Sequence, residues 1–158
     1  MMKLLQCDKG TGLVEFAFAL PLLAMLVIGI AETGRYAAFS VRVSNAARAG
    51  AQFAQSQGER TAYQSTDIAN AACADAGFTC STSASPNVMV VTATPFCLYS
   101  DGTSDPSCAL PAQGSGLQRL MYEKVTTSAR FTPLINYPML PASVAISSTT
   151  TMQVDQGQ

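Results

Sequence analysis

The sequence predicts an α+β protein in which a long N-terminal transmembrane and extended α-helix packs on a small antiparallel β-sheet of about three strands, stapled by disulfides. Three observations predict this fold class. A dense apolar run near the N-terminus continues into an Ala-rich stretch, short segments of period-two alternation follow near the C-terminus, and four of the five cysteines come after the apolar run. A chain of 158 residues is enough for one compact domain but not comfortably for two.

The apolar run covers residues 13–30 and contains one charged side chain, Glu15. A bilayer core of about 30 Å needs about 20 helical residues, so this run is long enough to span a membrane. A secretory signal peptide cleaved before Glu32 is one interpretation. The apolar core of a signal peptide is typically about 7–15 residues long, which is shorter than this run. The length therefore favours a helix that is retained as a membrane anchor.

The helix is expected to continue beyond the membrane, because residues 32–57 contain no Pro and are rich in Ala. Gly58 is a natural stop signal. One helix from about Leu13 to about Gln57 would be about 67 Å long at 1.5 Å per residue. Pro21 lies inside it, removes one backbone hydrogen bond, and is expected to bend it. A seam of small residues that would permit close helix approach recurs every seven residues, at Ala17, Ala24, Ala31 and Ala38.

Composition argues against several classes of function. The chain has 9 basic and 10 acidic residues, which gives no basic footprint for nucleic acid. It contains no His, so the commonest general base and metal ligand are missing. A membrane-tethered enzyme would need a carboxylate pair or a Ser–Lys arrangement, and Asp101 and Asp105 look like ordinary turn residues. We therefore expect no enzymatic activity and no cofactor.

The cysteines bear on topology as well as on folding. Positive charges alone, Lys3 and Lys9 before the run against three Arg after it, would put the C-terminal side in the cytoplasm. Four cysteines on that side instead indicate disulfides in an oxidising compartment, and we give this signal more weight. Four cysteines allow three connectivities. We favour the pairs closest in sequence, which are Cys73–Cys80 and Cys97–Cys108, over a zinc site.

The outer part of the chain is expected to hold one short helix and three strands. Residues 65–77 read as a helix that ends at Gly77, residues 86–94 as a central strand, and residues 97–118 as a loop. Alternation predicts two more strands, over 124–131 and 143–154. In the first of these strands, one face is Val125, Thr127, Ala129 and Phe131. The long helix is expected to cover the sheet with Tyr36, Val43 and Phe53.

Residues 10–16 read GTGLVEF, which resembles a type IV prepilin processing site. In that family, cleavage follows a Gly, and a Glu is the fifth residue of the mature chain. Gly10 would be the last leader residue and Thr11 the first mature residue, so Glu15 would be the fifth. Phe16 follows, as in the Flp/Tad branch of the family.

The longer string over 14–35 resembles the TadE-like proteins, whose pattern is V-E-F-A, then L-P, then an apolar run, then G-x-x-E-x-G-R. A break at 131–134 followed by a Thr-rich strand is similar too, whereas residues 60–118 match no family pattern. The residues that carry the resemblance are Val14, Glu15, Phe16, Ala17, Leu20, Pro21, Gly29, Glu32, Gly34 and Arg35.

The resemblance implies a minor pseudopilin of a Tad/Flp-type pilus, held in the bacterial inner membrane by a single span. Its parts would be a leader over 1–10, a transmembrane segment over 11–31, a continuing helix over 32–58 and a periplasmic domain over 59–158. Implied partners are the prepilin peptidase, companion pseudopilins and the major pilin, and the inner-membrane assembly platform. The pseudopilin could take a place in the pilus, at its base or tip. The alternative is a single-pass anchor that presents a disulfide-bonded binding domain without a pilus role.

Glu15 has a specific role in this interpretation. A charged side chain costs about 2.5–3.5 kcal/mol at the bilayer centre and less near an end. One explanation without any role in assembly is that the helix dipole favours a carboxylate near the helix N-terminus. The resemblance implies instead that cleavage after Gly10 creates an α-amino group on Thr11, and that this amine interacts with Glu15 within or between subunits during assembly.

Overall fold

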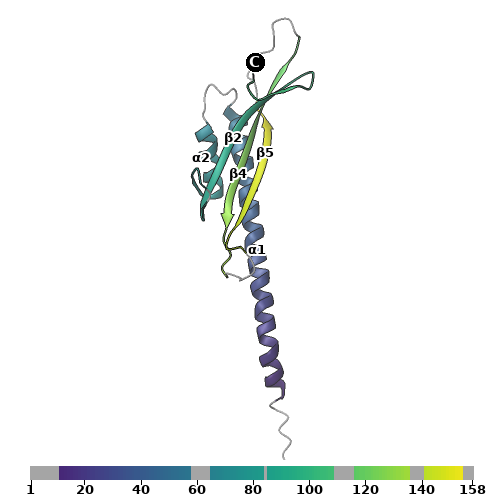
Figure 1. The fold of residues 1–158 in the computed structure, drawn as a ribbon, viewed down its shortest axis with the longest axis vertical. Helices are drawn as coiled ribbons and strands as arrows, with labels where there is room; N and C mark the ends of the chain where they lie inside the picture. Colours follow the sequence, from purple (N-terminus) through teal and green to yellow (C-terminus); the bar gives the residue numbers. More distant parts are fainter. Residues whose placement is uncertain (1–10, 58–64, 84, 109–115, 136–140, 155–158) are drawn as a thin grey trace, which may run out of the picture. The chain divides into compact units, whose positions relative to one another are not determined.

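The computed structural model describes residues 11–57, 65–83, 85–108, 116–135 and 141–154 (Figure 1). The chain divides into two compact units, residues 1–37 and residues 38–158, and each is described by itself. Residues 1–10, with Gly10 and the predicted leader, lie outside the described residues, so the structure does not bear on the predicted cleavage.

Helix α1 covers Thr11–Gln57 without interruption, 47 residues in all. The predicted helix from about Leu13 to about Gln57 is therefore confirmed. Ala and Leu dominate α1, and both residues have high helix propensity. Pro21 is its only proline, and the helix continues through it. The bend predicted at Pro21 stays a prediction.

The strands form one mixed sheet in the order β1-β2-β4-β5, and β3 pairs with β2. The three long strands β2, β4 and β5 run antiparallel to their neighbours, as predicted, whereas β1 runs parallel to β2. The long helix α1, the sheet and the two disulfides together confirm the predicted α+β class. The strands are β1 (Thr79–Cys80), β2 (Val88–Tyr99), β3 (Ser104–Asp105), β4 (Arg119–Phe131) and β5 (Val144–Gln153).

Two predictions about β2 and the segment after it were wrong in extent. The strand expected over 86–94 continues to Tyr99, and the loop expected over 97–118 contains β3. Pro95 obscured the continuation, because proline lacks an N–H and is usually found at strand edges. Among the described residues β2 is paired at Pro95 on the β4 side alone, so a donor can be missing there at low cost.

Helix α2 covers Ser65–Ala76 and ends where the sequence predicted. Gly77 follows it with a φ of 69°, the left-handed conformation that glycine adopts most easily. The N–H of Gly77 bonds to the C=O of Ala74, and the N–H of Phe78 bonds to the C=O of Cys73. This paired arrangement is a Schellman motif, which satisfies the last carbonyls of the helix.

The core lies between one face of the sheet and the helices. The predicted alternation in β4 is confirmed, since Val125, Thr127 and Ala129 are fully buried. Val43 of α1 is fully buried too, and Phe53 is partly buried, as expected. Tyr36 was predicted to cover the sheet, but it is 44% exposed. We call residues 38–158 the outer unit. Within it, the buried positions of α1 recur at intervals of three and four residues. They are Phe39, Val43, Ala46, Ala47, Gly50, Ala51 and Ala54.

Specific contacts fix α1 against the sheet within the outer unit. The ring of Phe39 makes edge-to-face contacts with Phe78 and Phe131, with centroid distances of 5.4 and 5.6 Å. The hydroxyl of Thr127 donates a buried hydrogen bond of 2.8 Å to the C=O of Val43. Sequence analysis missed that Glu123 lies on the same buried face of β4, where it is fully enclosed.

The two predicted disulfides are both present. Cys73 at the end of α2 is bonded to Cys80 in β1, and Cys97 in β2 is bonded to Cys108 beyond β3. The first disulfide therefore holds α2 to the sheet, and the second closes the loop that contains β3. Cys7 lies outside the described residues.

Candidate functional site: the apolar part of helix α1

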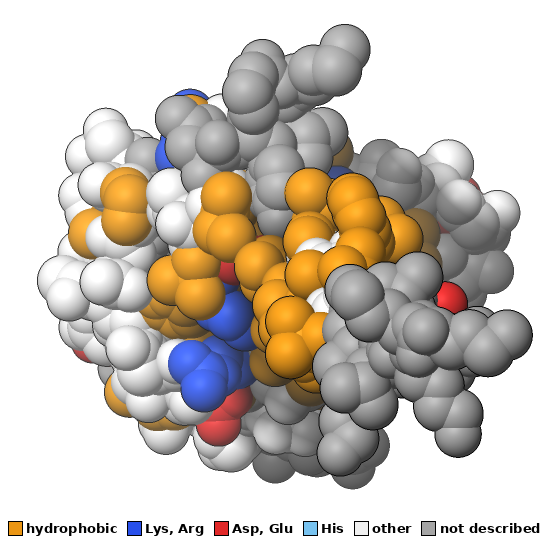
Figure 2. All heavy atoms as spheres, turned by 90° about the horizontal axis from the view of Figure 1, so that it is seen from below, with side chains coloured by type: hydrophobic (Ala, Val, Ile, Leu, Met, Phe, Trp, Pro, Cys, Tyr) orange, Lys and Arg blue, Asp and Glu red, His pale blue; other side chains and the backbone are white. Residues whose placement is uncertain are grey.

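The apolar part of α1 places its side chains entirely on the outside of the chain. Every residue from 12 to 31 is exposed, and no residue of its most apolar 18-residue window, with a mean hydropathy of 2.4, is buried. Figure 2 shows the molecule from the end at which α1 begins, where hydrophobic side chains gather. By length and composition this helix can cross a membrane. A core helix of a soluble protein would pass the same test, but it would be mostly buried.

Glu15 and Thr11 are brought onto the same side of the helix. The described part of α1 begins at Thr11, and Glu15 follows four residues later with an exposed side chain. Residues four apart on a helix are neighbours, and they are separated by about 6 Å along the axis. The backbone therefore places the Glu15 carboxylate within one turn of the main-chain nitrogen of Thr11.

Phe16 and Pro21 complete the N-terminal part of the predicted site. Phe16 is 61% exposed, so its ring is free of contact with the chain's own core. Pro21 has no N–H to donate, so the C=O of Ala17 lacks its usual partner in the helix. Neither the exposed Phe16 ring nor the missing N–H of Pro21 contributes to packing among the described residues.

A charged pair follows the apolar run. One Nη of Arg35 lies 3.1 Å from both carboxylate oxygens of Glu32, one helical turn apart. The Glu32 side chain is 14% exposed and that of Arg35 is 42% exposed. Such exposed pairs contribute only about 0–1 kcal/mol to stability. The pair instead acts locally: Arg35 neutralises the charge of a carboxylate that lies next to the apolar segment.

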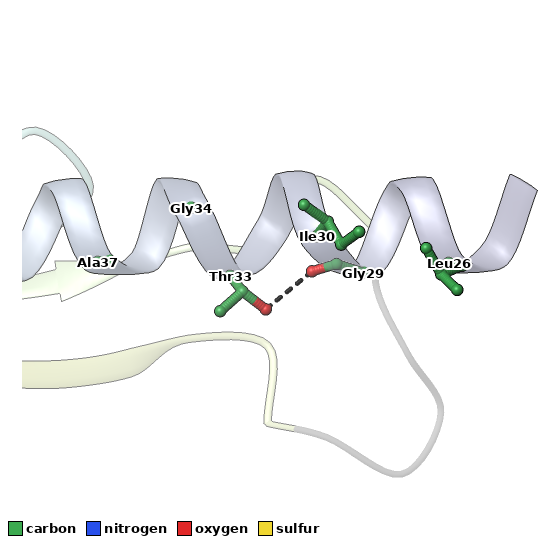
Figure 3. Close-up of a pocket in the computed structure, with 6 residues that line it drawn as sticks. All are labelled: Leu26, Gly29, Ile30, Thr33, Gly34 and Ala37. Carbon is green, nitrogen blue, oxygen red and sulfur yellow. Dashed lines mark hydrogen bonds between the residues drawn. The ribbon is translucent and has the colours of Figure 1, made fainter.

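A shallow groove runs along the same part of the helix (Figure 3). The hydroxyl of Thr33 points along it and donates a 2.8 Å hydrogen bond to the C=O of Gly29, so this polar group is satisfied within the helix. A Cβ atom built on Gly29 or Gly34 would meet nothing within 4 Å. The groove is lined by Leu26, Gly29, Ile30, Thr33, Gly34 and Ala37.

Sequence analysis named only two residues of this groove, Gly29 and Gly34. The signal that could have found the rest is the run of small residues four apart, Gly29, Thr33 and Ala37, which is typical of close helix–helix contacts in membranes. The predicted seam of four Ala residues lies on another side of the helix, and nothing in the structure tests it.

The carboxylates considered for catalysis are both used in turns. An oxygen of Asp101 accepts hydrogen bonds from the N–H and hydroxyl of Thr103, and these bonds lower the pKa of the Asp101 carboxyl. Asp105 binds Ser107 in the same way, at 2.8 and 2.6 Å. The hydroxyl of Tyr99 also donates to Asp105, and desolvation and the Asp105 charge raise the pKa of that phenol. These groups order the loop that the second disulfide closes.

A comparison with known protein families also points to the N-terminal part of the chain, which contains the candidate site. Residues 10–52 match the family described as TadE-like protein. The match begins at Gly10, includes the whole apolar part of α1 and ends in the buried outer part. No curated protein matches the chain, and no solved structure matches it.

Proposed function

Because residues 10–52 of this chain are TadE-like, we propose that it is a minor pseudopilin that takes part in assembling a Tad/Flp-type pilus. One observation carries the proposal. The matched segment combines a sequence that resembles a prepilin processing site with an apolar helix whose residues 12–31 are all exposed. An exposed apolar helix needs lipid or other helices around it, and a pilus assembly machine in a membrane supplies both.

The groove on α1 explains how such a helix could associate. In lipid there is little hydrophobic drive between helices, so small residues that let backbones approach closely are favoured at contacts. Gly29 and Gly34 have open space beside them. Their small size therefore serves no packing among the described residues, and we assign it to contact with a helix of a companion pseudopilin or the major pilin.

Glu15 has a matching role at the start of the helix. Removal of a leader after Gly10 would give Thr11 a positive α-amino group one turn from the Glu15 carboxylate. Opposite charges this close reduce the cost of placing each one near lipid. The same amine can be reached by Glu15 of a neighbouring subunit, which would align two helices along their axes.

The disulfides support the orientation of the domain. Structural disulfides persist in oxidising compartments such as the bacterial periplasm. We therefore place residues 59–158 in the periplasm and the span in the inner membrane, with the prepilin peptidase and the inner-membrane assembly platform as partners. In this role the protein acts by packing, without catalysis or a cofactor.

The first test is the N-terminus of the protein extracted from membranes that contain the prepilin peptidase. The proposal predicts a chain that begins at Thr11, and it predicts that Gly10→Val blocks this cleavage. A chain that begins at Met1 would support the plain membrane anchor, and one that begins at Glu32 would support a secretory signal peptide. Either of these results would refute the pseudopilin assignment.

The second test separates assembly from insertion. Glu15→Gln removes the charge but keeps the size of the side chain, so membrane insertion should be unchanged or improved while pilus formation falls. Asp75→Asn is the matched control, because Asp75 is an exposed carboxylate on α2, outside the candidate site, and its loss should leave pilus formation unchanged. Pili counted by electron microscopy give the readout. Wild-type piliation with Glu15→Gln would remove the role assigned to Glu15.

A further inference from the structure

The sheet has a second face that the core does not use. Its side chains come from the alternate positions of β2, β4 and β5, which lie side by side (Figure 1). The strand register aligns them in rows, and one row consists of Thr92, Thr126 and Thr149 across all three strands. We call this surface the hydroxyl face, after its seven hydroxyl side chains, Thr92, Thr94, Thr126, Ser128, Ser147, Thr149 and Thr151.

The hydroxyl face is open to solvent. Five of the seven hydroxyl residues are exposed, and Thr126 and Ser128 in the central strand are half-buried. The buried clusters that involve α1 and α2 use the opposite positions of the strands, such as Met89, Val125 and Ala129. Neither described helix therefore covers this face.

Several of these hydroxyls have hydrogen-bonding capacity to spare. Thr126 and Thr149 bond to each other at 3.0 Å, which leaves further donor or acceptor positions on both. Among the described residues, the hydroxyls of Thr92, Ser147 and Thr151 make no hydrogen bond. A hydroxyl both donates and accepts, so a ligand that is itself dense in hydroxyls fits such a lattice.

The charges on the hydroxyl face have one sign. Lys124 and Arg130 are both exposed, and the face carries no Asp or Glu at its strand positions. They lie six residues apart on β4, which corresponds to about 20 Å along a strand. Arg130 also touches the hydroxyl of Ser143 at 3.4 Å. The face thus offers two widely spaced cations among neutral hydroxyls, and apolar side chains such as Val90, Leu120 and Ala145 occupy other positions on it.

An aromatic pair marks one end of the face. The rings of Phe96 and Tyr122 are stacked, with centroids 5.4 Å apart and planes at 17°. Gln153 pairs with Tyr122 in the next strand and adds an amide, which both donates and accepts. Aromatic edges beside an amide and hydroxyls provide apolar and polar contacts to the same ligand.

The charge pattern discriminates between classes of ligand. Nucleic acid carries one phosphate about every 3.4 Å along each strand, and two cations about 20 Å apart are too few to neutralise it. A second copy of the same face would bring Lys124 and Arg130 against like charges, which is unfavourable. A polymer with many hydroxyls and occasional carboxylates matches both the hydroxyl lattice and the sparse cations.

From this complementarity we propose that the hydroxyl face binds an acidic polysaccharide, with Lys124 and Arg130 on its carboxylates and the Ser and Thr rows on its hydroxyls. This is a binding activity in addition to the role in pilus assembly, and it does not depend on that role. The stacked Phe96–Tyr122 pair would contact the apolar side of a sugar ring at one end of the site.

The experiment uses the full chain in nanodiscs of zwitterionic lipid, with hyaluronan oligosaccharides as the acidic probe and dextran as the neutral one. We expect saturable binding of hyaluronan that weakens with salt, and no binding of dextran. Lys124→Gln and Arg130→Gln should each reduce affinity roughly tenfold, as expected for loss of a hydrogen bond to a charged group. Arg42→Gln is the matched control, because Arg42 is an exposed cation on α1.

A second pair of variants tests the hydroxyls without altering charge. Thr149→Val and Thr151→Val keep the β-branched shape that strands favour, and together they should weaken hyaluronan binding with an unchanged circular dichroism spectrum. Absence of hyaluronan binding would overturn the proposal, as would equal affinity in the Lys124 and Arg130 variants. Binding to vesicles containing phosphatidylglycerol without binding to hyaluronan would also overturn it, in favour of lipid headgroups.

Discussion

In the apolar part of α1 every side chain from residue 12 to residue 31 is exposed, whereas the outer part of the same helix buries Val43, Ala46 and Ala47 completely. Glycine shows the contrast most clearly. A Cβ on Gly29 would meet nothing within 4 Å, but one on Gly50 would lie 3.1–3.2 Å from Val125, Ala72 and Ile68. The outer part packs against the sheet and α2, whereas the apolar part packs against none of the residues that the structure describes.

Small residues occur in both parts of α1, but they contact the sheet only in the outer part. In the outer part, Ala and Gly let the helix axis approach the sheet closely enough for Thr127 to reach the C=O of Val43. In the apolar part, Gly29 and Ala37 line a groove that no described residue of this chain fills. Close approach by another helix would give this second surface the function that the sheet gives the first.

The largest expected difference between the regions comes from truncating the same residue type in each. Ile68 is fully buried against Ala51, Ala54 and Val125, so Ile68→Ala should lower the free energy of unfolding of the outer domain by about 2–5 kcal/mol. Ile30 is 64% exposed, and Ile30→Ala should leave that free energy unchanged. Urea unfolding of the full chain in detergent, followed by near-UV circular dichroism of Tyr, measures both. Equal effects of the two variants would contradict the division.

The sequence predicted most of this division, because hydrophobic patterns are strong where a segment has one buried face or is apolar throughout. Alternation over 124–131 identified the buried face of β4, and the cysteine spacing identified both disulfides. The apolar run over 13–30 predicted a membrane-spanning helix, and the resemblance to the TadE-like proteins picked out Gly29, Glu32, Gly34 and Arg35. The ion pair between Glu32 and Arg35 then emerged from their spacing of three residues.

The errors occurred where tertiary contacts override local preference. Pro95 and the turn-rich sequence after it suggested a loop, but pairing with β4 carries β2 to Tyr99. Tyr36 looked like a core residue because it is large and partly apolar, yet the buried stripe of α1 begins at Phe39. Glu123 was missed because no sequence pattern predicts that a carboxylate is enclosed within a sheet face.

The next prediction enlarges one glycine in each part of α1. Gly50→Leu should destabilise the outer domain by about 2 kcal/mol, because overpacking typically costs about 1–3 kcal/mol and outweighs the gain in helix propensity. Gly29→Leu should leave that stability unchanged, since its Cβ has open space. Its effect should appear instead as a loss of pili, because a bulky side chain would fill the groove. A Gly29→Leu strain with normal pili would show that the groove is not a helix contact.

The smallest expected effect tests the link between α1 and the sheet. Thr127→Val keeps the side-chain shape but removes the hydroxyl that donates to the C=O of Val43, so the outer domain should lose about 0.5–1.5 kcal/mol. Thr92→Val is the matched control, because Thr92 is exposed on the opposite face of the sheet and its hydroxyl makes no hydrogen bond among the described residues. Urea unfolding of both variants gives the comparison. If the helix and sheet are joined by apolar packing alone, the two variants will be equally stable; if the hydrogen bond contributes, only Thr127→Val will shift the midpoint.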